Sequence, residues 1–291
     1  MNALTPGDMV AIAAPSSPFD KELLFQGISV LENMGFRVFI PDGIFETSSY
    51  LAGSDQHRAD ILSRLFADPR INAIFCARGG FGAMRMLPFL DTEIIRKNLK
   101  IFMGFSDITA ILSFLYSECN IPVFHGPMIA KLSESHPKTL ESVYVALTSE
   151  QTIDINIENG RTLKNGIGRG RIIGGNLSTL CHLLGTPFMP DFKKHILFLE
   201  DINEAPYRID RMLTQMKFAG CFEEIAGLVL GYFTNCGDAE DIIGIVNHIF
   251  QDNDIPILWG LETGHGEPNL TIPFGIEAEL DADHRTLRIL R

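Results

Sequence analysis

The sequence predicts an α/β protein: a mostly parallel, flavodoxin- or Rossmann-like amino-terminal domain, followed by a smaller, β-rich α/β domain. The first half alternates short apolar runs with amphipathic segments of helical period, which is typical of βαβ units. The second half has shorter strands and fewer helices between them. A polar tract with Asn-Gly turn signals lies between the halves. We therefore expect domains at 1–150 and 169–291, joined by a linker at 151–168.

The first half begins with an apolar run ended by a Pro-Ser-Ser-Pro loop, which predicts a buried strand. A helix then ends at Gly35, and the alternation continues to a last strand and helix. Parallel strands buried on both faces read as such continuous apolar runs, and their ligands lie at the carboxyl ends. The expected strands are 9–14, 36–40, 72–77, 99–104 and 122–127, with helices at 23–31, from 54 to 66, around 84–87, from 108 to 115 and at 137–147.

The second half begins with a strand and a helix, and continues through two more such pairs into a run of short strands. The helix at 207–218 is amphipathic and carries arginines. The expected strands are 171–176, 195–199, 225–230 and 255–260, with helices at 177–184, 207–218 and 238–250 and short strands in the remaining tail.

The composition limits the classes of function. Of 291 residues, 46% are hydrophobic and 21% charged, and the formal net charge is -12. An acidic chain without clustered Lys and Arg is a poor partner for nucleic acid or an anionic membrane. Five scattered cysteines predict neither a metal site nor a disulfide framework. We see no signal peptide and no apolar run long enough to span a membrane, so we expect a cytoplasmic protein.

Ser106 stands where an apolar strand breaks at Gly104 and a helix begins. A serine at such a turn is held over the free N–H groups of a helix start, which suits a nucleophile whose attack creates an oxyanion. Only half of the usual Gly-x-Ser-x-Gly elbow is present, because Asp107 and Ile108 follow. The alternative is that Ser106 merely caps the helix.

A nucleophilic serine needs a base, an orienting acid and oxyanion donors. Of the eight histidines, His125 in a Pro- and Gly-bounded turn and His265 between two glycines are the candidate bases, and the residues alone do not separate them. Glu200 ends an apolar strand and is the candidate acid, unless it only caps the next turn. The Gly79-Gly80 loop offers backbone amides as oxyanion donors; a phosphate cradle or a plain turn are the alternatives.

Six motifs in register resemble the LD-carboxypeptidase family, serine peptidases that include the microcin-immunity peptidases. The resemblance runs over most of the chain. The motifs are Ala77-Arg78-Gly79-Gly80-Phe81-Gly82, Gly104-Phe105-Ser106-Asp107, Phe124-His125-Gly126-Pro127, Gly174-Gly175-Asn176-Leu177-Ser178, Leu197-Phe198-Leu199-Glu200-Asp201 with Tyr207-Arg208-Ile209-Asp210-Arg211, and Gly264-His265.

The resemblance implies a role for each matching position. Ser106 would be the nucleophile, His265 the base and Glu200 the acid, with the amides of Gly80 and Asp107 as the oxyanion hole. It also implies removal of a terminal D-alanine from a murein tetrapeptide in peptidoglycan recycling, a homodimer, and no metal or organic cofactor. A free substrate carboxylate calls for arginine or backbone donors. The candidate substrate-binding residues are Arg78, Gly79, Arg85 and Arg208, with Arg169 as a further candidate arginine.

Two other functions remain open. A microcin-type immunity peptidase would cleave peptidyl or aminoacyl adenylate analogues, but the short stretch from Asn159 to Arg171 lacks an aromatic platform, and the only tryptophan, Trp259, lies in a late strand. A non-enzymatic anion- or nucleotide-binding module would use the Gly79-Gly80 loop, with Ser106 as a helix cap.

Overall fold

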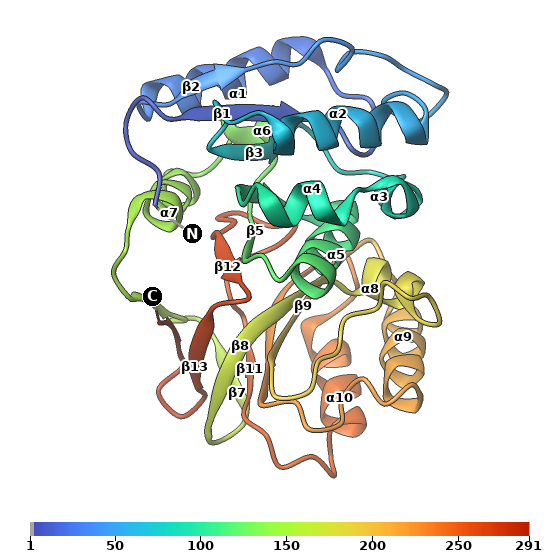
Figure 1. Cartoon of the computed structure of the whole chain (residues 1–291). Helices are drawn as coiled ribbons and strands as arrows, with labels where there is room; N and C mark the ends of the chain where they lie inside the picture. Colours follow the sequence, from blue (N-terminus) through green and yellow to red (C-terminus); the bar gives the residue numbers. More distant parts are fainter. Residues whose placement is uncertain (1–2, 291) are drawn as a thin grey trace. The chain divides into compact units, whose positions relative to one another are not determined.

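The computed structural model describes residues 3–290, which divide into two compact units (Figure 1). The first runs to Glu150 and also includes Pro268–Ile272. The second comprises Gln151–Glu267 and the chain from Pro273 onward. The short return of the chain into the first unit has no counterpart in the sequence-based expectation.

The first unit is built on a six-stranded sheet in the order β12-β5-β4-β3-β1-β2. The pairs from β2 to β5 are parallel. The order 2-1-3-4-5 is that of flavodoxin-like folds, with the reversal of strand order between β1 and β3. The strands are β1 (Met9–Ala13), β2 (Arg37–Phe39), β3 (Ala73–Cys76), β4 (Ile101–Gly104), β5 (Val123–His125) and β12 (Ile272–Phe274).

Helices connect these strands, and their caps follow from the sequence. Asp20 and Ser54 accept hydrogen bonds from the first-turn N–H groups of Leu23 and His57, so α1 and α2 begin at polar caps. Helix α1 packs on α6, and α4 packs on both α2 and α5. The helices are α1 (Lys21–Asn33), α2 (Asp55–Ala67), α3 (Ala83–Met86), η1 (Leu87–Phe89), α4 (Thr92–Lys97), η2 (Ser106–Ile108), α5 (Thr109–Cys119), α6 (Ile129–Leu132) and α7 (Pro137–Thr148).

The second unit contains an eight-stranded mixed sheet in the order β6-β14-β13-β8-β9-β10-β11-β7. Its centre, from β8 to β11, is parallel, and antiparallel strands flank it on both sides. The strands are β6 (Ile153–Asn156), β7 (Arg161–Lys164), β8 (Ile167–Asn176), β9 (Ile196–Ile202), β10 (Gly227–Thr234), β11 (Ile257–Trp259), β13 (Glu277–Asp281) and β14 (Thr286–Ile289); the helices are α8 (Leu177–Leu183), α9 (Pro206–Phe218) and α10 (Ala239–Ile249).

Residues 151–168 differ from the linker that the sequence suggested. They contain β6, β7 and the start of β8, and they belong to the second unit. β6 pairs with β14 and β7 with β11 at the two ends of the sheet. Edge strands are only half-buried, so their side chains are polar, and the Asn-Gly pairs form turns beside the strands. A polar edge with tight turns has the composition of a linker.

Each unit has its own apolar interior. In the first, Val10, Ile12, Phe75 and Met103 from neighbouring strands are buried together. In the second, Phe198 of β9 and its neighbour Val229 of β10 are both fully buried. Central strands buried on both faces hold the strand ends rigidly, and side chains at those ends are the ones that the structure positions well. Among the described residues, no helix is both long and apolar enough to cross a membrane.

Candidate active site

Ser106 follows β4 on a strained turn. Phe105 is extended, Ser106 has φ 62°, and η2 begins at Ser106 itself. Few non-glycine residues adopt a positive φ, and such strain is found where a side chain must be presented for function. The cap position of η2 is Phe105 and that of α5 is Ile108, so Ser106 does not stand at a cap position of either helix. The turn therefore has the sharp strand-to-helix geometry of a nucleophile elbow without its second glycine.

The loop after β3 lies directly against Ser106. A Cβ added to Gly79 would stand 3.2 Å from Ser106 Cβ and 3.5 Å from its Oγ. Gly80 has φ 118°, and a Cβ there would be 2.3 Å from Ser17 Oγ. Because neither glycine has a side chain, the main chain of the loop can lie close to Ser106 at Gly79 and close to Ser17 at Gly80. The structure thus brings together Ser106, Asp107, Gly79 and Gly80, all at the carboxyl edge of the first sheet.

Glu200 and His265 form a pair within the second unit. Glu200 lies near the end of β9 and is fully buried, and its Oε2 stands 2.7 Å from His265 Nδ1. The same oxygen accepts the His265 backbone N–H at 3.2 Å. A carboxylate can only accept, so the Nδ1 position carries the proton and Nε2 of the neutral ring is the basic nitrogen. This is the arrangement of an orienting acid and a general base.

Gly264 and a hydrogen bond from Thr234 place His265 against Glu200. Gly264 has φ 113°, and a Cβ there would stand 2.5 Å from Glu200 Oε2. Thr234 Oγ1 donates to the His265 carbonyl at 2.7 Å and ties the loop to β10. The loop position of His265 thus depends on a glycine at 264 and on an adjacent strand.

The environment raises the pKa of His265 above its usual 6.5 or so. Burial disfavours the charged imidazolium and lowers the pKa, but the hydrogen bond that His265 donates to Glu200, the charge of Glu200 and that of Asp201 outweigh burial. The two carboxylates therefore make the imidazole a stronger base. For the same reason the ring stays protonated up to a higher pH than a free histidine.

Asp201 holds the start of α8. It is buried, and accepts from Asn176 Nδ2 at 3.0 Å, Ser178 N at 2.9 Å and Ser178 Oγ at 2.7 Å. Burial raises the pKa of Asp201, although hydrogen bonds from Ser178 and from the Ile202 N–H act in the other direction. The sequence motifs contained these residues, but only their position at paired strand ends, with Asn176 opposite Glu200, shows what they do.

The other candidate base, His125, has a different environment. It lies on β5, is fully buried and packs edge-on against Phe105 with ring centroids 5.7 Å apart. His265 is partly accessible and bound to a carboxylate, and so the geometry favours His265 over His125 as the base.

The candidate arginines differ in their partners. Arg85 Nη2 lies 2.7 Å from Asp55 Oδ2, and Arg208 Nη1 lies 3.3 Å from Glu204 Oε2. Arg169 is paired with Glu279. Arg78 is exposed, immediately precedes Gly79 and donates to the Pro18 carbonyl at 2.6 Å. Of these arginines, Arg78 alone directly adjoins the Gly79-Gly80 loop.

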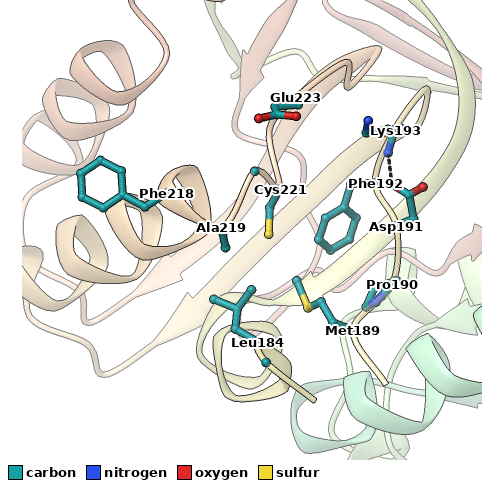
Figure 2. A pocket seen from close by; sticks show the side chains of 12 residues that line it. Leu184, Met189, Pro190, Asp191, Phe192, Lys193, Phe218, Ala219, Cys221 and Glu223 are labelled. Carbon is teal, nitrogen blue, oxygen red and sulfur yellow. Dashed lines mark hydrogen bonds between the residues drawn. The ribbon is translucent and has the colours of Figure 1, made fainter. Parts of the chain in front are cut away.

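The second unit contains a cavity of ≈ 590 Å³, and none of the candidate site residues lines it (Figure 2). Its lining comes from 184–193 and 218–223, which precede β9 and β10. It therefore lies at the amino ends of these strands, whereas Glu200 lies near the carboxyl end of β9.

Family models match both halves of the chain. The LD-carboxypeptidase N-terminal domain matches residues 10–126, and the LD-carboxypeptidase C-terminal domain matches residues 169–280. The chain belongs to the LD-carboxypeptidase family. The family assignment confirms the resemblance drawn from the six motifs and makes this chain a peptidase of that family.

Relatives cover nearly the whole chain. A probable murein peptide carboxypeptidase of Bacillus subtilis is 36% identical over 98% of this chain and 92% of its own length. The crystal structure of muramoyltetrapeptide carboxypeptidase from Oxalobacter formigenes aligns with a TM-score of 0.88 and 29% identity, over 97% of this chain and 99% of that one. The microcin C7 self-immunity protein MccF in complex with aspartyl sulfamoyl adenosine aligns with a TM-score of 0.92 and 27% identity, over 100% and 98%. This LD-carboxypeptidase chain therefore has the two-domain α/β fold of the family.

Proposed function

We propose that this chain is a serine LD-carboxypeptidase that removes the terminal D-alanine from a murein tetrapeptide. Ser106 is the nucleophile, His265 the general base and Glu200 the acid that orients it. The observation that carries the proposal is the buried Glu200–His265 pair, with 2.7 Å between Oε2 and Nδ1, in a family of peptidases. The positive φ of Ser106 supports the same assignment from the other unit.

The proposed reaction is acyl transfer through an acyl-enzyme. Ser106 Oγ attacks the amide carbonyl, and its proton passes to His265 Nε2. The N–H groups of Gly80 and Asp107 donate to the oxyanion. The C–N bond breaks as His265 returns the proton to the departing amine of D-alanine. Water, deprotonated by the same imidazole, then hydrolyses the ester and releases the tripeptide.

The D-alanine end of such a substrate carries a free carboxylate, which needs a donor. We assign this role to Arg78, because it adjoins Gly79 and donates to a backbone carbonyl, which carries no charge. Arg85 and Arg208 are paired with carboxylates, and a paired guanidinium has less charge to offer a ligand. A cytoplasmic homodimer acting in peptidoglycan recycling is the setting that we propose for this activity.

The test is the stereochemistry of the bond cleaved. The purified protein is incubated with the murein tetrapeptide and with its analogue ending in L-alanine, and free alanine and tripeptide are measured by mass spectrometry. Release from the D-terminal peptide alone is expected. No release from either peptide, with cleavage of an aminoacyl sulfamoyl adenosine, would instead assign the chain to adenylate-type substrates.

A further inference from the structure

The side chain of Asp107 has no role in the proposed reaction, in which only its N–H takes part. It nevertheless bonds outside its own turn. Oδ2 accepts from Ser16 Oγ, which is fully buried, and from Ala83 N at 2.9 Å. Ser16 belongs to the loop after β1 and Ala83 begins α3, directly after the Gly79-Gly80 loop. One carboxylate oxygen thus joins three loops at one edge of the sheet.

Two further hydrogen bonds join the loop after β1 to the Gly79-Gly80 loop. Ser17 N donates to the Gly79 carbonyl at 3.3 Å, and Phe81 N donates to Ser17 Oγ at 3.1 Å. These bonds lie on both sides of Gly80 and hold it at a φ of 118°, which glycine adopts readily because it has no Cβ. The direction of the Gly80 N–H therefore depends on where the loop after β1 lies.

A buried arginine also binds the two loops that Asp107 joins. Arg58 of α2 is 2% exposed; its Nη1 donates to the Pro15 carbonyl and, at 3.0 Å, to the Gly82 carbonyl, and its Nη2 pairs with Asp55. Burial raises the pKa of Asp107, while bonds from Ser16, Ala83 and Gly82 and the Arg58 charge act in the opposite direction. A buried carboxylate that accepts several hydrogen bonds holds the groups that donate to it in place.

We propose that the Asp107 carboxylate is a positioning residue: by binding Ser16 and Ala83 through one oxygen, it fixes the Gly80 loop against the Ser106 turn. This inference rests on the proposed function, because it concerns the direction of the two oxyanion donors. A donor that is displaced stabilises the transition state poorly but leaves ground-state binding intact. The carboxylate therefore acts on kcat and not on KM.

Two substitutions separate this role from a purely structural one. Asp107→Ala removes the accepting oxygen, and we expect kcat to fall about 100-fold with KM changed less than about threefold. Asp107→Asn keeps an oxygen where Oδ2 stands, which can still accept from Ser16 and Ala83, so it should restore kcat to within about tenfold of wild type. Ser29→Ala, which loses a hydroxyl bonded only within α1, is the control and should match wild type.

The decisive readout is the affinity of two ligands, measured by calorimetry on folded protein. A phosphonate analogue of the tetrapeptide carries an anionic oxygen in place of the oxyanion, and its Kd should rise in Asp107→Ala about as much as kcat falls. The Kd of the tripeptide product should stay the same. Equal weakening of both ligands, or unchanged kcat in Asp107→Ala, or no rescue by Asp107→Asn, would overturn the proposal.

Wild type and Ser106→Ala are assayed alongside. Inactivity of wild type contradicts the proposed function itself, whereas an active wild type with an unaffected Asp107→Ala contradicts only the positioning role.

Discussion

The two halves of the proposed catalytic machinery are built by different means. In the first unit, Ser106 is presented by backbone: a positive φ, a glycine loop beside it and loop-to-loop hydrogen bonds. In the second, Glu200 and His265 are held by a side-chain contact at a strand end and a glycine that permits it. The first half depends on conformational strain and the second on electrostatics in a buried site. Substitutions in the two halves should therefore fail in different ways.

Glu200→Gln should have the largest effect in the second half. Its amide cannot hold the Nδ1–H tautomer as a carboxylate does, so we expect kcat/KM to fall by about 10³- to 10⁴-fold. Wild-type kcat/KM should rise with pH through the pKa of His265, above about 6.5, because the base must be neutral. In Glu200→Gln the residual activity should titrate at lower pH, since the group that raises this pKa is gone.

The control for Glu200→Gln is Glu277→Gln. Glu277 is an exposed partner of Arg171 at 3.4 Å, and its replacement should leave both the rate and the pH profile unchanged.

The pH dependence of folding stability is a second test of the Glu200–His265 pair. The raised pKa of His265 stabilises wild type at low pH, and this contribution is lost as pH rises through that pKa. A wild-type stability advantage over Glu200→Gln that grew with rising pH in this window would count against the pairing.

Gly264→Ala should affect both activity and stability. The added Cβ would stand 2.5 Å from Glu200 Oε2 at φ 113°, so either the loop or the carboxylate must move. We expect a loss of about 1–3 kcal/mol in the free energy of unfolding and about 100-fold in kcat, since His265 loses its place. Gly244→Ala in α10, where a Cβ meets nothing within 4 Å, should instead gain up to about 1 kcal/mol. Urea denaturation and steady-state kinetics measure both; equal behaviour of the two variants would refute the role of Gly264.

Arg78→Ala should chiefly weaken substrate binding. If Arg78 receives the terminal carboxylate, KM for the tetrapeptide should rise about tenfold with little change in kcat. Arg85→Ala, which removes an exposed ion pair with Asp55, should change KM less than about twofold. Kinetics on both variants decide the matter: a larger KM effect at Arg85 than at Arg78 would reverse our assignment.

The smallest expected effect concerns the strain at Ser106. With φ at 62°, glycine is favoured over alanine, so Ser106→Gly should be more stable than Ser106→Ala by about 1 kcal/mol. At Ser29, inside α1, the order should invert, with glycine less stable than alanine by about 1 kcal/mol. Thermal denaturation of the four variants gives both differences. The same order at both positions would mean that the Ser106 turn stores no strain.

The same contrast explains how much the sequence could predict. The apolar runs of β1, β3 and β4 are buried on both faces, and continuous hydrophobic stretches between turn residues identified them directly. Ser106, Glu200 and His265 each stand at a recognisable break in the pattern. The polar edge strands β6 and β7 have no such signal, because half-buried strands alternate weakly and resemble a linker.

Contacts between residues far apart in the sequence could not be predicted either. Glu200 and His265 are 65 residues apart, and only their tertiary contact favours His265 over His125 as the proposed base. Arg58 lies on a helix with polar neighbours and gives no sign in the sequence that it is 2% exposed and binds two carbonyls. The positive φ of Ser106 is likewise a result of the surrounding loops, since serine itself does not favour it.

The most direct test of the account is D-alanine release from the murein tetrapeptide by Ser106→Ala, measured beside wild type and Ser29→Ala at equal concentration. The account predicts release by wild type and Ser29→Ala, and a loss of at least about 10⁴-fold in Ser106→Ala with an unchanged far-UV circular dichroism spectrum. Ser106→Ala that still released D-alanine at a rate close to wild type would contradict the serine mechanism.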